Sequence, residues 1–248
     1  MGHLDSHCHL DDPRFGPDLS AVAARAAAAG VCAAVVPGVK VDTLDRPLPD
    51  VPGVTLYRAG GLHPIFDHPP DGLARLEAAL EAGQLVAVGE CGLDKRHRHP
   101  DDLARFHAQL DLAVAYDRPI ILHVVHAHEE VIAALKQRRV RGVVHAFAGS
   151  WHLAQRYLDL GMVLGLGGIG TWPTATRLHE TIKACPEGGY VLETDAPDLS
   201  PSWIRGQRNE PAELVGIAAA IATLRDTTPE AVLAASDAAG SALFGIPL

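Results

Sequence analysis

The sequence predicts a (β/α)₈ barrel, and two observations lead to this prediction. Short apolar runs rich in β-branched residues alternate with alanine- and leucine-rich stretches of helical length, and histidines or carboxylates stand where these runs end. Strands that alternate with helices imply parallel βαβ units. Eight such units fit into about 250 residues, and the chain has 248. The length alone also suits two small domains, but the alternation favours one barrel over residues 1–248.

The elements follow one another in regular order along the chain. The expected strands end in the segments HLDSHCH, VCAAVVPG, TLYRAGGLH, LVAVGE, PIILHV, GVVHAF, MVLGLGG and YVLETD. The expected helices cover residues 19–29, 71–82, 101–116, 128–138, 152–160, 175–185, 211–224 and 229–243. Between the second and third strands, KVDTLDRPLPDVPG contains three prolines and cannot hold a full helix, so we expect an irregular crossover there.

The composition argues against several classes of protein. A formal net charge of −9 does not suit a large, non-specific binder of duplex DNA, which needs a broad basic face. The sequence shows no cationic, apolar leader and no apolar run long enough to span a bilayer, so we expect a soluble, cytoplasmic protein that does not act at a membrane. The cysteines form no C-x-x-C pair, which suits a reducing compartment.

Polar side chains of metal-binding type stand at the ends of the expected strands. They are His7 and His9 at the first strand, then His63, Glu90, His123, His145 and Asp195 at the third, fourth, fifth, sixth and eighth. In a barrel these positions converge at the C-terminal mouth, where active sites are built. One histidine could be an ordinary hydrogen-bonded residue, but a whole set at one end favours a metal site.

Strand alternation indicates which side chains point inward, because residues i and i+2 share a face. If His7 and His9 point into the barrel, Cys8 points towards the helices, as Cys91 does beside an inward Glu90. Two-residue steps back from the ligands reach Val88, Val86, Ile121, Val143 and Val191, branched residues of the kind that fill a barrel. Asp5 and Glu193 interrupt this apolar pattern, and we expect them to orient ligand imidazoles.

Four histidines with two carboxylates can hold two divalent metal ions. Imidazole and carboxylate suit zinc, manganese or iron, whereas magnesium is less at home among so many nitrogens. A water held between two such ions becomes hydroxide near neutral pH, so the chemistry implied is metal-assisted hydrolysis.

The ordered motifs LDSHCHLD, GLHP, GECGLD, PIILH, GVVHAF, ETDAP and RNEP resemble those of the TatD family of metal-dependent hydrolases, within the amidohydrolase superfamily. The resemblance covers nearly the whole chain, and GVVHAFAGS, GLGGIGTWP and VLETDAPD are similar to the YjjV-like branch. It implies that the metal ligands are His7, His9, Glu90, His123, His145 and Asp195. It further implies that Glu90 bridges both ions, that Asp195 also holds or deprotonates the attacking water, and that His63 polarises the substrate without binding metal.

The resemblance also implies an activity, because family members are deoxyribonucleases that often act on DNA 3′ ends. We therefore expect DNA, as single strands or short ends, to be the substrate of a monomer that needs no protein partner. Two features depart from the family pattern. Val124 and Val125 follow His123 where many members have an arginine or a similar polar residue, which removes a phosphate contact, and the short crossover changes one wall of the mouth.

Further substrate contacts are expected from two loops. Gly167 and Gly168, in GLGGIG after the seventh strand, lie where barrels often hold phosphate, although the G-x-G-x-x-G match alone does not predict a dinucleotide site. Arg205, Arg208 and Asn209, after the eighth strand, would complete a phosphate site or else form a capped, solvated loop.

Two other polar segments lie near the expected mouth. His126 and His128 lie two apart where a helix begins and so do not share a helical face, which suggests loop or solvent histidines. KRHRHP, residues 95–100, lies on the catalytic side as a solvated loop or as a lip that guides phosphate.

The sequence therefore predicts a two-metal hydrolase of DNA phosphodiester bonds. The alternative is an amidohydrolase-type enzyme that cleaves a small C–N or ester substrate, because the superfamily's site also activates water on carbonyl carbon. A non-catalytic metal-binding or scaffold protein is the third class, and it fits less well because no structural role requires an open metal mouth.

Overall fold

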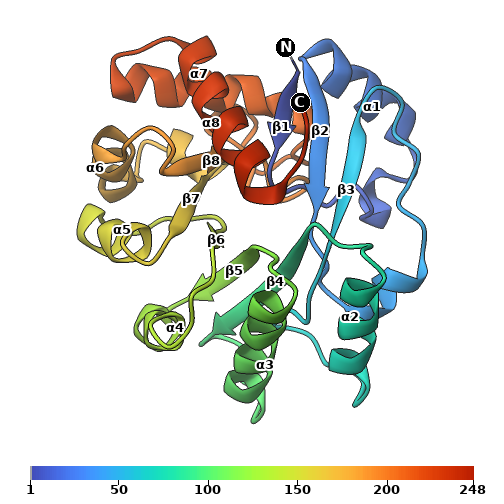
Figure 1. The fold of residues 1–248 in the computed structure, drawn as a ribbon. Coiled ribbons are helices and arrows are strands. Elements are labelled where there is room, and N and C mark those ends of the chain that lie inside the picture. The colour runs from blue at the N-terminus through green and yellow to red at the C-terminus, as the bar shows by residue number, and fades with distance from the viewer. Residues whose placement is uncertain (1) are drawn as a thin grey trace.

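Eight parallel strands with helices between them form a (β/α)₈ barrel, as the sequence predicts (Figure 1). The computed structural model describes residues 2–248. The strands are β1 (His3–Asp5), β2 (Val31–Val36), β3 (Thr55–Gly60), β4 (Ala87–Asp94), β5 (Ile120–Val125), β6 (Gly142–Val144), β7 (Met162–Leu166) and β8 (Tyr190–Leu192). The helices are α1 (Leu19–Ala28), α2 (Gly72–Glu81), α3 (Asp102–Ala115), α4 (His128–Leu135), α5 (Trp151–Leu158), α6 (Thr176–Ala184), α7 (Leu214–Arg225) and α8 (Pro229–Phe244). Within the described chain, no helix combines the length and the apolar character needed to cross a membrane.

The strands pair in sequence order from β1 to β8, and backbone contacts close the ring between these two. The N–H and the hydroxyl of Ser6 both donate to the carbonyl oxygen of Leu192, at 3.0 and 2.9 Å. Beyond the strands, the N–H of Asp195 donates to the carbonyl oxygen of His7 at 2.9 Å. The seam that closes the barrel therefore also brings two of the expected metal ligands together.

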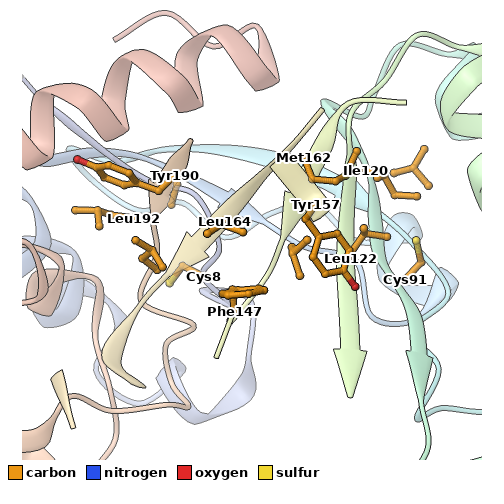
Figure 2. Packing of buried hydrophobic residues seen from close by; sticks show 14 of the residues in the cluster. Cys8, Cys91, Ile120, Leu122, Phe147, Tyr157, Met162, Leu164, Tyr190 and Leu192 are labelled. Atoms are coloured by element: carbon orange, nitrogen blue, oxygen red, sulfur yellow. The ribbon is translucent and has the colours of Figure 1, made fainter. Parts of the chain in front are cut away.

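Apolar side chains form an inner and an outer layer. Val35, Ile121, Val143 and Val191 lie in the inner cluster, which also includes Phe244 at the end of α8. The outer cluster fills the space between strands and helices, and Figure 2 shows part of it. The inner cluster is aliphatic at the barrel wall, so it supports a polar mouth without offering hydrogen-bond partners of its own.

Alternation along the strands correctly predicted the cysteines but not every valine. Cys8 and Cys91 lie fully buried in the outer layer (Figure 2). Val88 lies there too, while Ala87 belongs to the inner cluster, so the prediction that Val88 points inward was wrong. The reason is a register shift in the β4–β5 pairing between Val88 and Cys91, which resets the alternation before Glu90.

Three connections differ from what regular βα units would give, namely those that follow β1, β2 and β8. The β2–β3 crossover holds only a short 3₁₀ turn, Val41–Asp45, as its prolines predicted. The strands β1 and β8 end earlier than expected, at Asp5 and Leu192, so His7, His9 and Asp195 lie in the loops that follow these strands.

Gly92 offers a test of the close β4–β5 contact. Its φ is +145°, and an added Cβ would lie 2.0 Å from the carbonyl oxygen of His123. We expect Gly92→Ala to lower the free energy of unfolding by about 3 kcal/mol or more, because the strands must separate. Gly83→Ala is the matched control: its φ is +67° but nothing lies within 4 Å of the added Cβ, so it should cost only about 1 kcal/mol. Urea unfolding compares the two variants, and equal losses would contradict the steric argument.

Candidate metal centre

Glu90 is a buried carboxylate around which histidines gather. Its Oε2 lies 3.3 Å from His7 Nε2 and 3.8 Å from His9 Nε2. Its Oε1 lies 2.8 Å from His123 Nδ1 and 3.1 Å from His63 Nε2. The two oxygens of one carboxylate thus face two different pairs of imidazoles.

Asp195 faces the same space from the closing seam of the barrel. Its Oδ1 lies 3.5 Å from His7 Nε2, 3.6 Å from His9 Nε2 and 3.5 Å from His145 Nε2. Its φ is 56°, a left-handed conformation that aspartate tolerates better than most residues. The structure thus brings together all six predicted ligands: His7, His9, Glu90, His123, His145 and Asp195.

The loop after β3 brings His63 against Glu90. An added Cβ at Gly61 would lie 2.6 Å from the carbonyl oxygen of Glu90, so only glycine allows this approach. Buried Gln109 of α3 fixes the loop through Leu62. Its side chain accepts from the N–H of Leu62 at 2.7 Å and donates to the carbonyl oxygen of Leu62 at 3.2 Å. Sequence reasoning missed Gln109, since a single glutamine within a helical stretch carries no signal.

Two more carboxylates lie behind the ligand histidines. Glu193 Oε1 lies 2.9 Å from His145 Nδ1, as expected. Asp94 Oδ2 lies 3.1 Å from His123 Nε2 and was not predicted, although alternation places Asp94 on the same face of β4 as Glu90. A carboxylate on one ring nitrogen fixes the tautomer and leaves the other nitrogen free to bind a metal.

Asp5 and Asn209 hold the backbone of the site. Asp5 accepts from the N–H of His7 at 3.3 Å, and from the N–H and hydroxyl of Thr194 at 2.9 and 2.5 Å. Within residues 2–248 it accepts no hydrogen bond from an imidazole, so the prediction that Asp5 orients one was wrong. Asn209 is fully buried and donates to the carbonyl oxygens of Thr194 and Asp198, at 2.7 and 2.9 Å. It therefore positions the segment that carries Asp195, and the prediction that Asn209 binds substrate is not supported.

The two predicted arginines are engaged elsewhere. Arg208 donates to both carboxylate oxygens of Asp18, at 2.7 Å each, and to Glu210 at 3.0 Å. Arg205 lies 4.4 Å above the ring of Trp172. Because carboxylates already neutralise Arg208 and neither arginine lines the mouth cavity, the structure does not support a phosphate site built from them.

The predicted glycines do not line the main cavity, but they line a small pocket beside it together with Glu193 and Asp195. An added Cβ at Gly168 would lie 2.0 Å from the carbonyl oxygen of Leu199, and one at Gly167 would lie 2.9 Å from that of Glu193. These glycines allow close packing beneath the loop after β8, so a role in substrate binding is not supported.

The site opens into a cavity of about 900 Å³ at the C-terminal mouth. His126 and His128, expected as loop or solvent histidines, both line it, and His128 Nδ1 lies 3.0 Å from the hydroxyl of Tyr157. Within residues 2–248, neither falls in a group of side chains close enough to hold a metal ion. Arg96, from segment 95–100, also lines the cavity, which places this segment on the catalytic side as predicted.

The charges in the site compensate one another. Burial by itself would raise the pKa of Glu90, but His63, His145 and His7 hold this pKa well below its usual range. Burial would lower the pKa of His145, but Glu193, Asp195 and Glu90 raise it to about 10. An imidazole binds metal only as a neutral base, so His145 must release its proton when an ion binds.

The donors fit divalent metal ions. Three groups of side chains have donor atoms within 4.8 Å of one another, namely His7–His145–Glu193, His7–His9–Asp195 and His63–Glu90–His123. Glu193 Oε2 and His7 Nδ1 are buried without a hydrogen-bond partner in the described chain, so these two atoms remain available for a further interaction. Imidazole with carboxylate is a donor set typical of zinc, manganese and iron.

Comparison with known proteins agrees with this class of site. The family model TatD related DNase matches residues 4–245, and the chain belongs to this family of metal-dependent hydrolases. It is 36% identical over 254 residues to the uncharacterized metal-dependent hydrolase YjjV of Escherichia coli, with 98% of each chain covered. It is 34% identical over 264 residues to the 3′-5′ ssDNA/RNA exonuclease TatD of Klebsiella pneumoniae, again with 98% of each covered.

Solved structures show the same fold. The crystal structure of Escherichia coli YjjV superimposes with a TM-score of 0.87 at 34% identity, covering 99% of this chain and 98% of that one. A Campylobacter jejuni dihydroorotase superimposes with a TM-score of 0.62 at 12% identity, over 100% of this chain and 84% of the other. The second likeness shows a shared barrel and nothing about substrate.

The buried carboxyl of Asp5 leads to a prediction about pH. Burial raises the pKa of Asp5 to about 7, so the native state binds a proton that the unfolded state releases near pH 4. The contribution of Asp5 to the free energy of unfolding therefore falls as pH rises from about 4 to 7, by up to about 4 kcal/mol. Asp5→Asn removes this term, so its stability relative to the wild type should increase over that range. Urea unfolding in EDTA from pH 4 to 8 measures the difference, and a constant difference would contradict it.

Proposed function

We propose that this protein hydrolyses phosphodiester bonds of single-stranded nucleic acid, DNA above all, from an end and with two divalent metal ions. The observation that carries the proposal is the position of Glu90, whose two oxygens face different histidines. His7 and His9 lie near Oε2, Asp195 lies near the same two imidazoles, and His123 lies at Oε1. A carboxylate placed in this way is suited to bridge two ions.

Two divalent ions held there would acidify an attacking water and neutralise charge on the phosphate. Asp195 lines the cavity and is suited to take the proton of that water. Burial would raise the pKa of Asp195, but His145, His9 and His7 hold it below its usual value. The carboxylate is therefore ionised at neutral pH, the form that a proton acceptor requires.

The hydrogen bonds of His63 support a role in substrate polarisation over a role as metal ligand. The N–H of Ile65 donates to His63 Nδ1 at 3.2 Å, which places the proton of the neutral ring on Nε2. Burial lowers the pKa of His63, which favours this neutral form. Nε2 then carries the one N–H of the ring; it lies 3.1 Å from Glu90 and can donate to a substrate oxygen in place of this carboxylate.

Relatives support nucleic acid as the substrate. The TatD protein of Klebsiella pneumoniae, named as an exonuclease of single-stranded DNA and RNA, matches this chain over almost its whole length. The cavity is lined by Val124 and Val125 where many family members have an arginine or a similar polar residue, so that residue's contact with phosphate is missing on this wall. Arg96, which lines the same cavity, forms an ion pair with Asp94, so its charge is already partly neutralised and attracts phosphate less strongly.

The first experiment combines metal analysis with a substrate panel. We expect up to two zinc, manganese or iron ions per chain, with magnesium tested alongside. End-labelled single strands should be cleaved faster than the matching blunt duplex. Rapid hydrolysis of dihydroorotate or lactones without cleavage of either oligonucleotide would instead show the alternative, a hydrolase of small C–N or ester substrates.

Variants at the two carboxylates should separate metal binding from turnover. Glu90→Gln removes the bridging charge, so we expect loss of at least one ion per chain and at least about a hundred-fold loss of activity. Asp195→Asn should keep most of the metal and lose about 10²- to 10⁴-fold in kcat, because it removes the proton acceptor. His126→Ala, which lines the same cavity, is the control and should keep its bound metal. Unchanged turnover in either carboxylate variant would contradict the assignment.

A further inference from the structure

The mouth contains an aromatic side chain that does not serve the core. Phe66 lines the cavity and is half-buried, and it belongs to neither apolar cluster of the described chain. The other phenylalanines, Phe15, Phe106, Phe147 and Phe244, all lie in those clusters. Ile65, next to Phe66, likewise lines the cavity outside both clusters. Core packing therefore does not explain why these two residues are apolar.

Phe66 stands beside the proposed catalytic groups. Its ring centroid lies 5.6 Å from that of His63, with an angle of 55° between the ring planes. The N–H of Phe66 donates to the carbonyl oxygen of His63 at 3.2 Å, so the two residues form one turn. His63 in turn lies 3.1 Å from Glu90. An aromatic surface is thus fixed to the residue that faces the reacting centre.

A free cation accompanies this ring. Lys40 Nζ lies 4.5 Å from the centroid of Phe66, and Lys40 is exposed. Among residues 2–248 it forms no ion pair, whereas the cavity-lining arginines Arg14 and Arg96 are bound by Asp198 and Asp94. Lys40 therefore keeps a positive charge that a phosphate can use at the rim of the cavity.

We propose that Phe66 and Lys40 form a subsite for one unpaired nucleotide next to the scissile bond. Lys40, which lies over the ring of Phe66 in the free protein, moves to a phosphate, and the base takes its place on the ring. This inference rests on the proposed function and names the part of the substrate that the enzyme recognises. Stacking tolerates any base, because every base has a π-face, but it requires a base that has left the duplex. The subsite would thereby select single strands without reading their sequence.

The test of Phe66 asks whether the effect of removing this side chain depends on one particular base of the substrate. Single-stranded oligonucleotides carrying one abasic residue, moved along the strand, are compared with the intact strand in the wild type and in Phe66→Ala. One position should lower kcat/KM about ten-fold or more in the wild type and cause no further loss in Phe66→Ala. Phe66→Leu keeps an apolar side chain against His63 and should lose DNA turnover as Phe66→Ala does. Trp203→Ala removes an exposed aromatic outside the cavity and should leave the abasic profile unchanged.

Binding is measured separately from turnover by fluorescence anisotropy in the Asp195→Asn background. Lys40→Ala should reduce the slope of log affinity against log salt by about 0.7, the value for one phosphate contact on a single strand. Lys136→Ala, at the C-terminal end of α4, removes a lysine remote from the cavity and should leave the slope unchanged.

Each arm can overturn the subsite. DNA cleavage with no position coupled to Phe66, or full activity in Phe66→Leu, would overturn it and leave the proposed function standing. In the anisotropy experiment, an unchanged salt slope in Lys40→Ala would overturn it even if no strand is cleaved, a result that would separately reject the proposed function.

Discussion

The mouth of this barrel depends on one constraint, the burial of an ionised carboxylate at Glu90. A charge removed from water is destabilising by several kcal/mol unless opposite charges or hydrogen-bond donors surround it. Glu90 is only 3% exposed, and imidazoles from the loops after β1 and β3 and from β5 provide its surroundings. The convergence of strand ends in a barrel is what allows residues so far apart in the sequence to meet this one requirement.

The same constraint extends to the backbone and to the next layer of side chains. Gly61 permits the β3 loop to pass against the main chain of Glu90, and Gly92 permits β4 to lie close to β5. Asp94 and Glu193 stand behind His123 and His145 and fix which ring nitrogen faces inward. The positions of the donors are thus determined before any ion binds, which is the condition for a site that binds metal with defined geometry.

Sequence reasoning was most successful where periodicity and topology alone determine position. Eight expected strands, six of which end in a histidine or a carboxylate, were enough to predict the barrel and its polar mouth. Alternation placed Cys8 and Cys91 outside the barrel. It failed at Val88, because a register shift cannot be read from a pattern of period two. The same alternation rule places Asp94 on the face of Glu90, but Asp94 was not among the predicted site residues.

The loops after the strands were less predictable, because charge and loop position do not reveal partners. Arg208 has the composition of a phosphate ligand, but Asp18, distant in sequence, already neutralises it. Asn209 has the sequence context of a polar loop residue, but it is fully buried and donates a hydrogen bond to the backbone of Thr194. Phe66 carried no sequence signal at all, since an aromatic residue beside a motif is expected to be core.

The electrostatics of the mouth link the acidic composition to the proposed chemistry. Four carboxylates and six histidines line the cavity, and the arginines that line it are bound to aspartates. Protein groups alone therefore offer little attraction to a polyanion, in keeping with the formal net charge of −9. Bound divalent ions are often the largest local charges in such a site, so they would supply most of the attraction at the scissile phosphate. Besides the metals, recognition of such a substrate requires only one cation, one stacking surface and a mouth that admits the end of the strand. These contacts do not select a base sequence, but they do require that the strand be unpaired.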